Sequence, residues 1–419
     1  MNLLIKGARL VDPASGEEEV GDLYVSEGKI AAPFARPERT IDAKGLVVSP
    51  GFIDLAARLR EPGQEYKATL ESEMAAAVAG GVTSLACPPD TDPPLDEPGL
   101  VDMLRRRAKA LTRARVYPVG ALTVKLAGES LTEMGQLAQA GCVAFSQANV
   151  PVEDTQVLWR ALQYAATFGF PVWLRAQDSW LAKDGVAHDG EVATRLGLPA
   201  IPAFAETIAL GVLLELVRAS GARVHVCRLS SAGAVAMMRA AKREGLPVTC
   251  DVSIHHLHLS ERDIGYFDPL CRLDPPLRGD ADREALAAGL AEGTIDCAVS
   301  DHTPVDDDGK HLPFGEAEAG ATGLELLLPL VLKWAAARKL PLAKALAVIT
   351  AEPARILGVA SGRLAPGAPA DLAVLDPKAE YRLSAESLKS QGKNTPFLGH
   401  SLNGRVLYTI VAGNVVYEA

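Results

Sequence analysis

The chain has 419 residues, which is enough for one large core and a smaller satellite unit. Its formal net charge of −10 argues against nucleic acid and anionic membrane as partners, because both bind basic surfaces. No apolar run approaches the roughly 18 residues that span a bilayer, and the N-terminus lacks the pattern of a signal peptide. The six cysteines include no C-x-x-C pair, which predicts reduced thiols in a cytoplasmic protein.

Both ends of the chain are rich in β-forming residues. Near the start, residues 3–12, 22–31 and 40–48 have the character of turn-linked strands, and residues 370–376 and 405–419 resemble them. Neither end alone supplies enough strands for a stable sheet. We therefore predict that residues 1–50 and 357–419 pair into one small β-sandwich-like domain.

The middle of the chain, residues 51–356 with a short lead-in, alternates β-rich runs with alanine- and leucine-rich helical segments. Eight such runs occur, at residues 46–56, 81–87, 114–121, 141–146, 170–176, 222–230, 246–253 and 294–301. Alternation of strands and helices implies parallel pairing through right-handed crossovers, and eight units close into a barrel. The prediction is an α/β protein with a (β/α)8 TIM-type barrel over residues 51–356, whose functional groups lie at the C-terminal ends of the strands.

The first of these runs, "GFIDLAARLREPG", is built like the approach to an active site. Residues two apart on a strand point to the same face, so Ala56 and Arg58 stand where two side chains would meet one centre. Several further short motifs are specific: "LREPG" (59–63), "RLGLP" (195–199), "PPLR" (275–278), "SDH" (300–302) and "NTPF" (394–397).

A barrel flanked by a composite β domain, with these motifs, resembles the metal-dependent amidohydrolases and among them the dihydroorotases. The resemblance runs almost from end to end. It implies zinc ligands at the ends of the barrel strands, and this chain has replaced nearly all of them: only Asp301 remains, and the other ligand positions hold Ala56, Arg58, Gln147, Arg175 and Arg228.

The replacements have opposite chemistry to metal ligands. Alanine has no donor atom, and a protonated guanidinium carries only N–H donors and repels a divalent cation. A catalytic zinc needs about three protein ligands, and without it the pKa of water stays near 15.7. We therefore predict no bound zinc, no cofactor and no functional catalytic residue, with Asp301 as a vestige.

The substrate-binding positions that the resemblance implies have also changed. Arg60, which would hold a substrate carboxylate, is retained. Asp90 and Asp274 occupy positions where the family pattern has asparagine, and two added carboxylates would repel an anionic substrate. These three residues are predicted to form a vestigial pocket.

Two interpretations of the three mouth arginines remain open. They can pair with Asp301 and Asp54 in a buried network that replaces the metal charges, or they can form an anion site for phosphate or a carboxylated metabolite. The densest histidine group, His255, His256 and His258, lacks carboxylates or cysteines at ligand spacing and is predicted to form structural hydrogen bonds.

The resemblance further implies a role. Some inactive dihydroorotase-like chains assemble with aspartate carbamoyltransferase, so a structural subunit in pyrimidine biosynthesis, in a homodimer or mixed oligomer, is the first hypothesis. The alternatives are an active dihydroorotase or other cyclic-amide hydrolase with an atypical metal centre, and a regulator that binds a ligand at the arginine-lined mouth.

Overall fold

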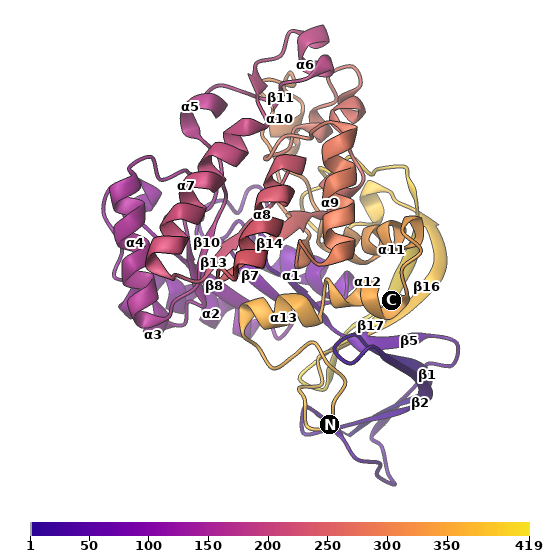
Figure 1. Ribbon diagram of the computed structural model, residues 1–419. Helices are drawn as coiled ribbons and strands as arrows, with labels where there is room; N and C mark the ends of the chain where they lie inside the picture. Colours follow the sequence, from indigo (N-terminus) through magenta and orange to yellow (C-terminus); the bar gives the residue numbers. More distant parts are fainter. Residues whose placement is uncertain (1) are drawn as a thin grey trace.

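The computed structural model describes residues 2–419 and contains the expected barrel (Figure 1). Its eight parallel strands are hydrogen-bonded in sequence order from one side to the other. They are β6 (Phe52–Asp54), β7 (Val82–Cys87), β8 (Arg115–Ala121), β9 (Ala144–Ser146), β10 (Val172–Leu174), β13 (Val224–Val226), β14 (Val248–Ser253) and β15 (Cys297–Val299). The predicted fold class and strand count are confirmed.

The barrel is nearly closed between its first and last strands. Beyond the end of β15, the backbone N–H of Ser300 donates to Asp54 Oδ1 at 2.9 Å, and Ala57 and His302 form a parallel bridge. Asp54 is fully buried, and burial raises its pKa above the ordinary value. The Asp54 carboxyl group therefore helps to join the first and last strands of the barrel, a junction called the seam below.

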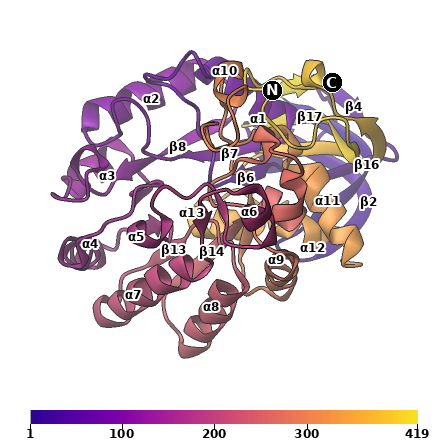
Figure 2. The ribbon, with the colours of Figure 1, turned by 90° about the horizontal axis from the view of Figure 1, so that it is seen from above.

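Helices surround the strands, as the view along the barrel shows (Figure 2). Helix α4 (Thr155–Phe168) illustrates why: its buried residues are Leu158, Ala161, Leu162 and Ala165, the spacing of one helical face. The other helices are α1 (Leu70–Ala79), α2 (Pro98–Ala110), α3 (Met134–Ala140), α5 (Ser179–Ala182), α6 (Glu191–Leu196), α7 (Phe204–Ser220), α8 (Ala232–Glu244), α9 (Asp280–Glu292), α10 (Asp307–Lys310), α11 (Leu327–Ala337), α12 (Leu342–Ala347) and α13 (Ala351–Leu357).

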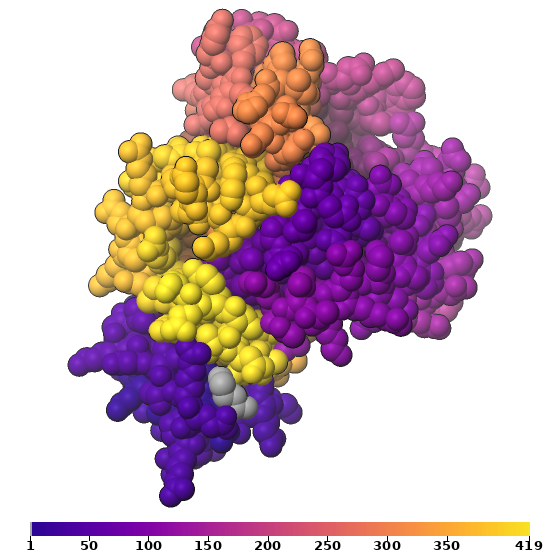
Figure 3. Space-filling view, turned by 180° about the vertical axis from the view of Figure 1, so that it is seen from behind, coloured from indigo at the N-terminus to yellow at the C-terminus, as the bar shows by residue number. Residues whose placement is uncertain are grey.

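The two ends of the chain form one mixed sheet. Its strands are β1 (Leu3–Asp12), β2 (Glu17–Ser26), β3 (Lys29–Ala31), β4 (Arg39–Asp42), β5 (Val47–Pro50), β16 (Leu372–Arg382), β17 (Ser401–Val411) and β18 (Asn414–Glu418). The N-terminal β5 joins the halves, since it pairs parallel with β1 and antiparallel with β16. From behind, the yellow C-terminal strands lie between the indigo N-terminal strands and the barrel (Figure 3). The expectation that the termini complete each other's sheet is confirmed.

A small two-stranded sheet, β11 (Ala187–His188) with β12 (Ala200–Ile201), lies in the excursion between β10 and α7. Within residues 2–419, no helix is both long enough and apolar enough to cross a bilayer.

Candidate functional site at the barrel mouth

The residues singled out from the sequence lie on the segments that follow the barrel strands. Arg58 follows β6, Arg175 follows β10, Arg228 follows β13 and Asp301 follows β15. Because parallel strands all end at the same rim, these side chains meet over the barrel axis. The three guanidinium groups, with side-chain exposures of 4–6%, are almost wholly excluded from solvent.

Arg58 is held by acceptors from several strand ends. Its Nε donates to Asp90 Oδ2 at 2.7 Å, its Nη1 to Thr303 Oγ1 at 3.1 Å and its Nη2 to Asn149 Oδ1 at 3.1 Å. Asp301 Oδ1 lies 3.8 Å from Nη1. Burial alone would raise the pKa of Asp90, but the Arg58 guanidinium lowers it below the ordinary value. Asp90 is therefore the counter-ion of Arg58.

Arg228 and Asp301 form the most enclosed ion pair of the mouth. Arg228 Nη1 lies 3.2 Å from Asp301 Oδ1, and the two side chains are 5% and 7% exposed. Arg228 Nη2 donates to Asn149 Oδ1, which thus accepts from two arginines. Burial opposes the charged form of Arg228, yet the Asp301 carboxylate raises the pKa of Arg228 above its ordinary value. Arg228 therefore carries its charge in the folded protein.

Both residues of this pair also have unusual backbone conformations. Arg228 has φ 53° and Asp301 has φ 50°, in the left-handed region that residues other than glycine rarely adopt. The N–H of Arg228 is fixed there by Asp251 Oδ1 at 2.7 Å. The strained turns aim both side chains inward over the barrel.

Arg175 pairs with Asp274. Its Nη1 lies 2.5 Å from Asp274 Oδ2, and the same oxygen accepts from Asn149 Nδ2 at 3.1 Å. Burial would raise the pKa of Asp274, but Arg175 and then Arg228 lower it. Asp90 and Asp274, expected as repellents of an anionic substrate, instead neutralise the arginines.

Two expectations from the sequence need correction or refinement. Asp54 does not pair with the arginines, because it accepts hydrogen bonds from the backbone and hydroxyl of Ser300. Arg60 is buried and donates to the Pro304 carbonyl at 2.8 Å and to Gln64 Oε1 at 3.0 Å, so its guanidinium is engaged within the protein. Both side chains were expected to act at the mouth, but each is instead engaged in hydrogen bonds within the protein.

Gln147 and Ala56 complete the set of ligand positions. Gln147 Nε2 donates to Thr123 Oγ1 at 2.8 Å and to the Leu126 carbonyl at 2.9 Å, which turns its amide toward neighbouring loops. Ala56 is 8% exposed and borders a cavity of about 30 Å³ between Arg58, Arg228 and neighbouring apolar groups. A space of this size holds about one or two water molecules and no substrate.

The residues present do not fit the zinc that the resemblance implies. Arginines occupy three of the ligand positions, Ala56 offers no donor, and Asp301 is committed to Arg228 and Arg58. The side chains of His225, Cys227 and Asp251 lie close together nearby. However, both His225 ring nitrogens are 2.8 Å from Thr249 Oγ1 or Asp251 Oδ2, and burial raises the pKa of the Cys227 thiol. These groups form a hydrogen-bonded cluster, so the ring nitrogens of His225 are already engaged and are not free to bind a metal.

The histidine group on the segment after β14 is structural, with one exception to the expected hydrogen bonding. His256 Nε2 lies 3.1 Å from the Pro275 carbonyl, and His258 Nε2 lies 2.8 Å from the Leu330 carbonyl. His255 stacks on Phe397, and neither of its buried ring nitrogens has a hydrogen-bond partner within residues 2–419. Burial lowers the pKa of all three imidazoles to about 4.

Asn149 is the mouth residue whose role was missed. It stands just after β9, where the sequence pattern shows only the loss of an acidic residue, yet its amide contacts Arg58, Arg228 and Asp274. The sequence did contain a signal for this role, namely a polar side chain a few residues beyond the end of a predicted strand.

Together the fold and mouth define a class: an amidohydrolase-type barrel with a terminal mixed sheet, in which ion pairs occupy the centre of the mouth. Comparisons with known proteins agree with this fold. The profile of the "Dihydro-orotase-like" family matches residues 45–234. The chain is similar to a dihydroorotase-like protein of Pseudomonas aeruginosa (44% identical) and to a dihydroorotase of Geobacter sp. strain M21 (41% identical), each with all of both chains covered.

Among solved structures, the L-hydantoinase (dihydropyrimidinase) of Arthrobacter aurescens superimposes with a TM-score of 0.89 at 25% identity, covering 99% of this chain and 96% of that one. A dihydropyrimidinase of Brevibacillus agri, at 20% identity and TM-score 0.82 over 100% and 95% of the two chains, shares the fold. The chain belongs to the dihydroorotase-like family of the amidohydrolase superfamily.

Proposed function

We propose that this protein is a non-catalytic dihydroorotase-like subunit of pyrimidine biosynthesis that supports the assembly of aspartate carbamoyltransferase. One observation carries the proposal: Arg58, Arg175 and Arg228 stand at ligand positions, and their counter-ions are carboxylates of the same chain. The mouth is thus internally neutralised, and the cavity of about 30 Å³ between Arg58 and Arg228 is too small for a substrate. A mouth of this kind preserves the shape of the barrel and has no means of activating water.

An exposed apolar surface supports a role in assembly. Side chains from α5, α7 and the segment after β9 border one hollow beside the mouth, and Trp180 is 73% exposed and Ile208 47%. Val150 and Val212 line the same hollow and are exposed, and Phe204 lies one turn before Ile208 on α7. Clustered exposed apolar groups mark protein–protein contact sites more often than isolated ones do. We assign this surface to the partner chain.

The test combines association and catalysis. The chain is co-expressed with the aspartate carbamoyltransferase chain of its own cell and analysed by size-exclusion chromatography and carbamoyltransferase assay. We expect co-elution and higher transferase activity in the complex than in the isolated transferase. Elution as two separate species would contradict the assembly role.

Matched variants locate the contact. Trp180→Asp is expected to weaken the complex at least about tenfold, since an anchoring tryptophan commonly contributes 2 kcal/mol or more. Tyr266→Asp removes another exposed aromatic side chain, 89% exposed and away from this hollow, and is expected to leave association unchanged. Equal losses of association in both variants would refute the assigned surface. The assembly role itself would still be decided by whether the two chains co-elute.

The second candidate is an active dihydroorotase or other cyclic-amide hydrolase, favoured by relatives that are named dihydroorotase at 41% identity over the full length. Purified protein, assayed for dihydroorotate hydrolysis with and without added zinc, discriminates between the two. We expect no turnover above background. Turnover that Asp301→Asn abolishes would establish the enzyme and refute the non-catalytic role.

A further inference from the structure

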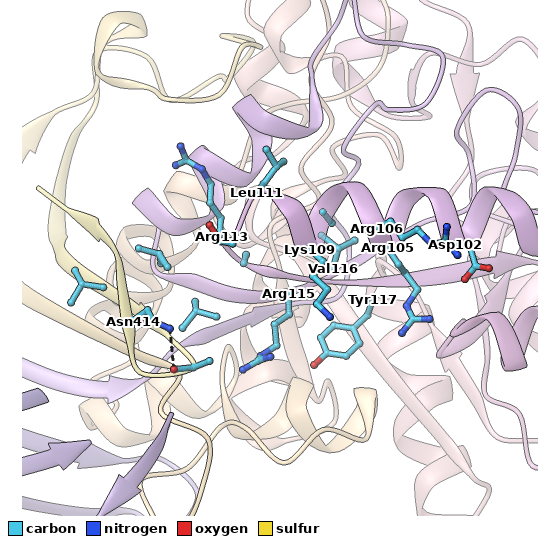
Figure 4. A pocket seen from close by; sticks show the side chains of 17 residues that line it. Asp102, Arg105, Arg106, Lys109, Leu111, Arg113, Arg115, Val116, Tyr117 and Asn414 are labelled. Carbon is cyan, nitrogen blue, oxygen red and sulfur yellow. Dashed lines mark hydrogen bonds between the residues drawn. The ribbon is translucent and has the colours of Figure 1, made fainter. Parts of the chain in front are cut away.

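A basic groove lies at the opposite end of the barrel strands from the mouth. Its lining comes from the second half of α2, the start of β8 and the turn between β17 and β18, and it encloses about 1020 Å³ (Figure 4). The stretch Leu104–Arg115, "LRRRAKALTRAR", carries six basic residues and no acidic one, in a chain whose net charge is −10. This local reversal of charge calls for a physical explanation.

Basic side chains from α2 and from β8 face the same groove. Arg105 and Lys109 are four residues apart on α2 and therefore lie on the same helical face. Arg115 and Tyr117 are two apart on β8 and share a face of that strand. In Figure 4 these four side chains point into the same space from the helix and from the strand, whereas Arg113 points away.

Within residues 2–419 these cations are only partly compensated. Arg115 donates from Nε and Nη2 to the buried carboxylate of Asp371, both at 3.1 Å, and its Nη1 has no recorded partner. Arg105 donates from Nη1 to the Ala140 carbonyl, and neither Arg105 nor Lys109 forms an ion pair within the described residues. The one acidic residue of the lining is Asp102, which Figure 4 places at the edge of the group.

The helix dipole explains only part of this arrangement. A cation in the last turn of a helix is favourable, and this accounts for Lys109 and for Arg107, which pairs with Glu61 outside the groove. It does not account for Arg115, which belongs to a strand, or for a concave site that brings the groups together. Arg105 and Lys109 lack a carboxylate partner in the described part of the chain, so their like charges repel each other, and an anionic ligand removes that repulsion.

We propose that this groove binds a small polyphosphate ligand, such as a nucleoside triphosphate or a free polyphosphate. Guanidinium groups bind phosphate oxygens in pairs and the lysine adds a compact charge, so a chain of phosphates can engage Arg105, Lys109 and the free Nη1 of Arg115 together. The Tyr117 hydroxyl adds a hydrogen-bonding group on the same side. The overall negative charge and the confined size of the groove disfavour a nucleic acid.

The experiment is calorimetric titration of the full chain with sodium tripolyphosphate and, separately, with ATP at the same ionic strength. We expect saturable binding of tripolyphosphate that weakens as salt increases, because exposed charges are screened. Comparable affinity for both ligands identifies the phosphate chain as the recognised group, and tighter binding of ATP adds a contact to the nucleoside. Absence of saturable binding of either ligand at about 0.1 M salt overturns the proposal.

Variants separate a site from general electrostatic attraction. The double variant Arg105→Gln/Lys109→Gln alters exposed side chains and is expected to weaken binding at least about tenfold, the size of losing charged hydrogen bonds. Arg243→Gln/Lys339→Gln makes the same change in net charge at exposed positions outside the groove and is expected to bind as the wild type does. Equal weakening in both double variants refutes the site.

Discussion

The mouth and the basic groove both gather arginines, yet they treat the charge in opposite ways. At the mouth, each guanidinium is almost wholly buried and faces a carboxylate: Arg58 with Asp90, Arg175 with Asp274, and Arg228 with Asp301. In the groove, Arg105 and Lys109 are exposed and lack recorded ion pairs within the described residues. Where water is excluded, an unpaired charge is too costly to tolerate, but where water has access it can remain available for a ligand.

The largest expected effect breaks a pair at the mouth. Asp301→Ala leaves Arg228 buried without its counter-ion, which should lower the free energy of unfolding by about 3–5 kcal/mol. Urea denaturation measures the change. Asp189→Ala, at an exposed position, is the control and should change stability little.

Replacing both partners tests whether the pair itself stabilises the fold. The double variant Arg228→Met/Asp301→Leu should recover most of the stability lost in Asp301→Ala, because two apolar groups leave no uncompensated charge. If Asp301→Ala were as stable as the wild type, the network would not explain how the mouth is neutralised.

A smaller loss is expected from Asn149→Ala. Its carbonyl oxygen accepts from Arg58 and Arg228, so truncation leaves two buried guanidinium groups each short of an acceptor. The expected cost is about 1–3 kcal/mol, again from urea denaturation. Asn403→Ala, on an exposed position of the terminal sheet, provides the comparison, and similar losses in both would remove the bridging role of Asn149.

A further prediction concerns pH and the buried histidines on the segment after β14. His255, His256 and His258 have a pKa of about 4 in the folded protein and 6.5 ordinarily, because burial disfavours their charged form. The unfolded chain therefore gains protons below about pH 6.5 while the folded chain stays neutral, so stability falls as pH drops from about 6.5 to about 4. Each histidine contributes at most about 1.4 kcal/mol per pH unit.

His255→Leu should make this decline shallower, which thermal unfolding between about pH 7 and pH 5 would detect. His311→Gln changes an exposed histidine and should leave the decline as it is in the wild type. Asp90 and Asp274 do not contribute in this window, since the pKa of each lies below its ordinary value of 3.8.

The smallest effect is expected in the groove. Lys109→Gln should change the melting temperature by no more than about 1 °C, because relief of its repulsion from Arg105 one helical turn away offsets the loss of its favourable interaction with the C-terminus of α2. Differential scanning calorimetry at low salt measures it. A loss of stability comparable to that of Asn149→Ala would mean that Lys109, like the arginines of the mouth, has an internal counter-ion.

Much of the fold follows from local pattern. The alternation of eight β-rich runs with amphipathic helices predicts the barrel. The β-rich ends predict a shared sheet, because neither end alone has enough strands for a stable one. It is equally visible in the sequence that Ala56, Arg58, Arg175 and Arg228 cannot coordinate zinc, since alanine and arginine offer no ligand atom in any fold.

The pairing inside the mouth was decided by tertiary structure. The sequence offered Asp54 and Asp301 as counter-ions, but Asp54 bonds Ser300 across the barrel seam, and Asp90, Asp274 and Asn149 take its place. These residues come from different strand ends, and only barrel closure brings them within hydrogen-bonding distance. The basic groove also depends on tertiary structure. Its charge is visible in the sequence of Leu104–Arg115, but its concave shape arises where α2 and β8 meet the turn between β17 and β18. Residue type fixes what a group can donate, accept or coordinate, whereas its partner depends on which distant segments the core brings beside it.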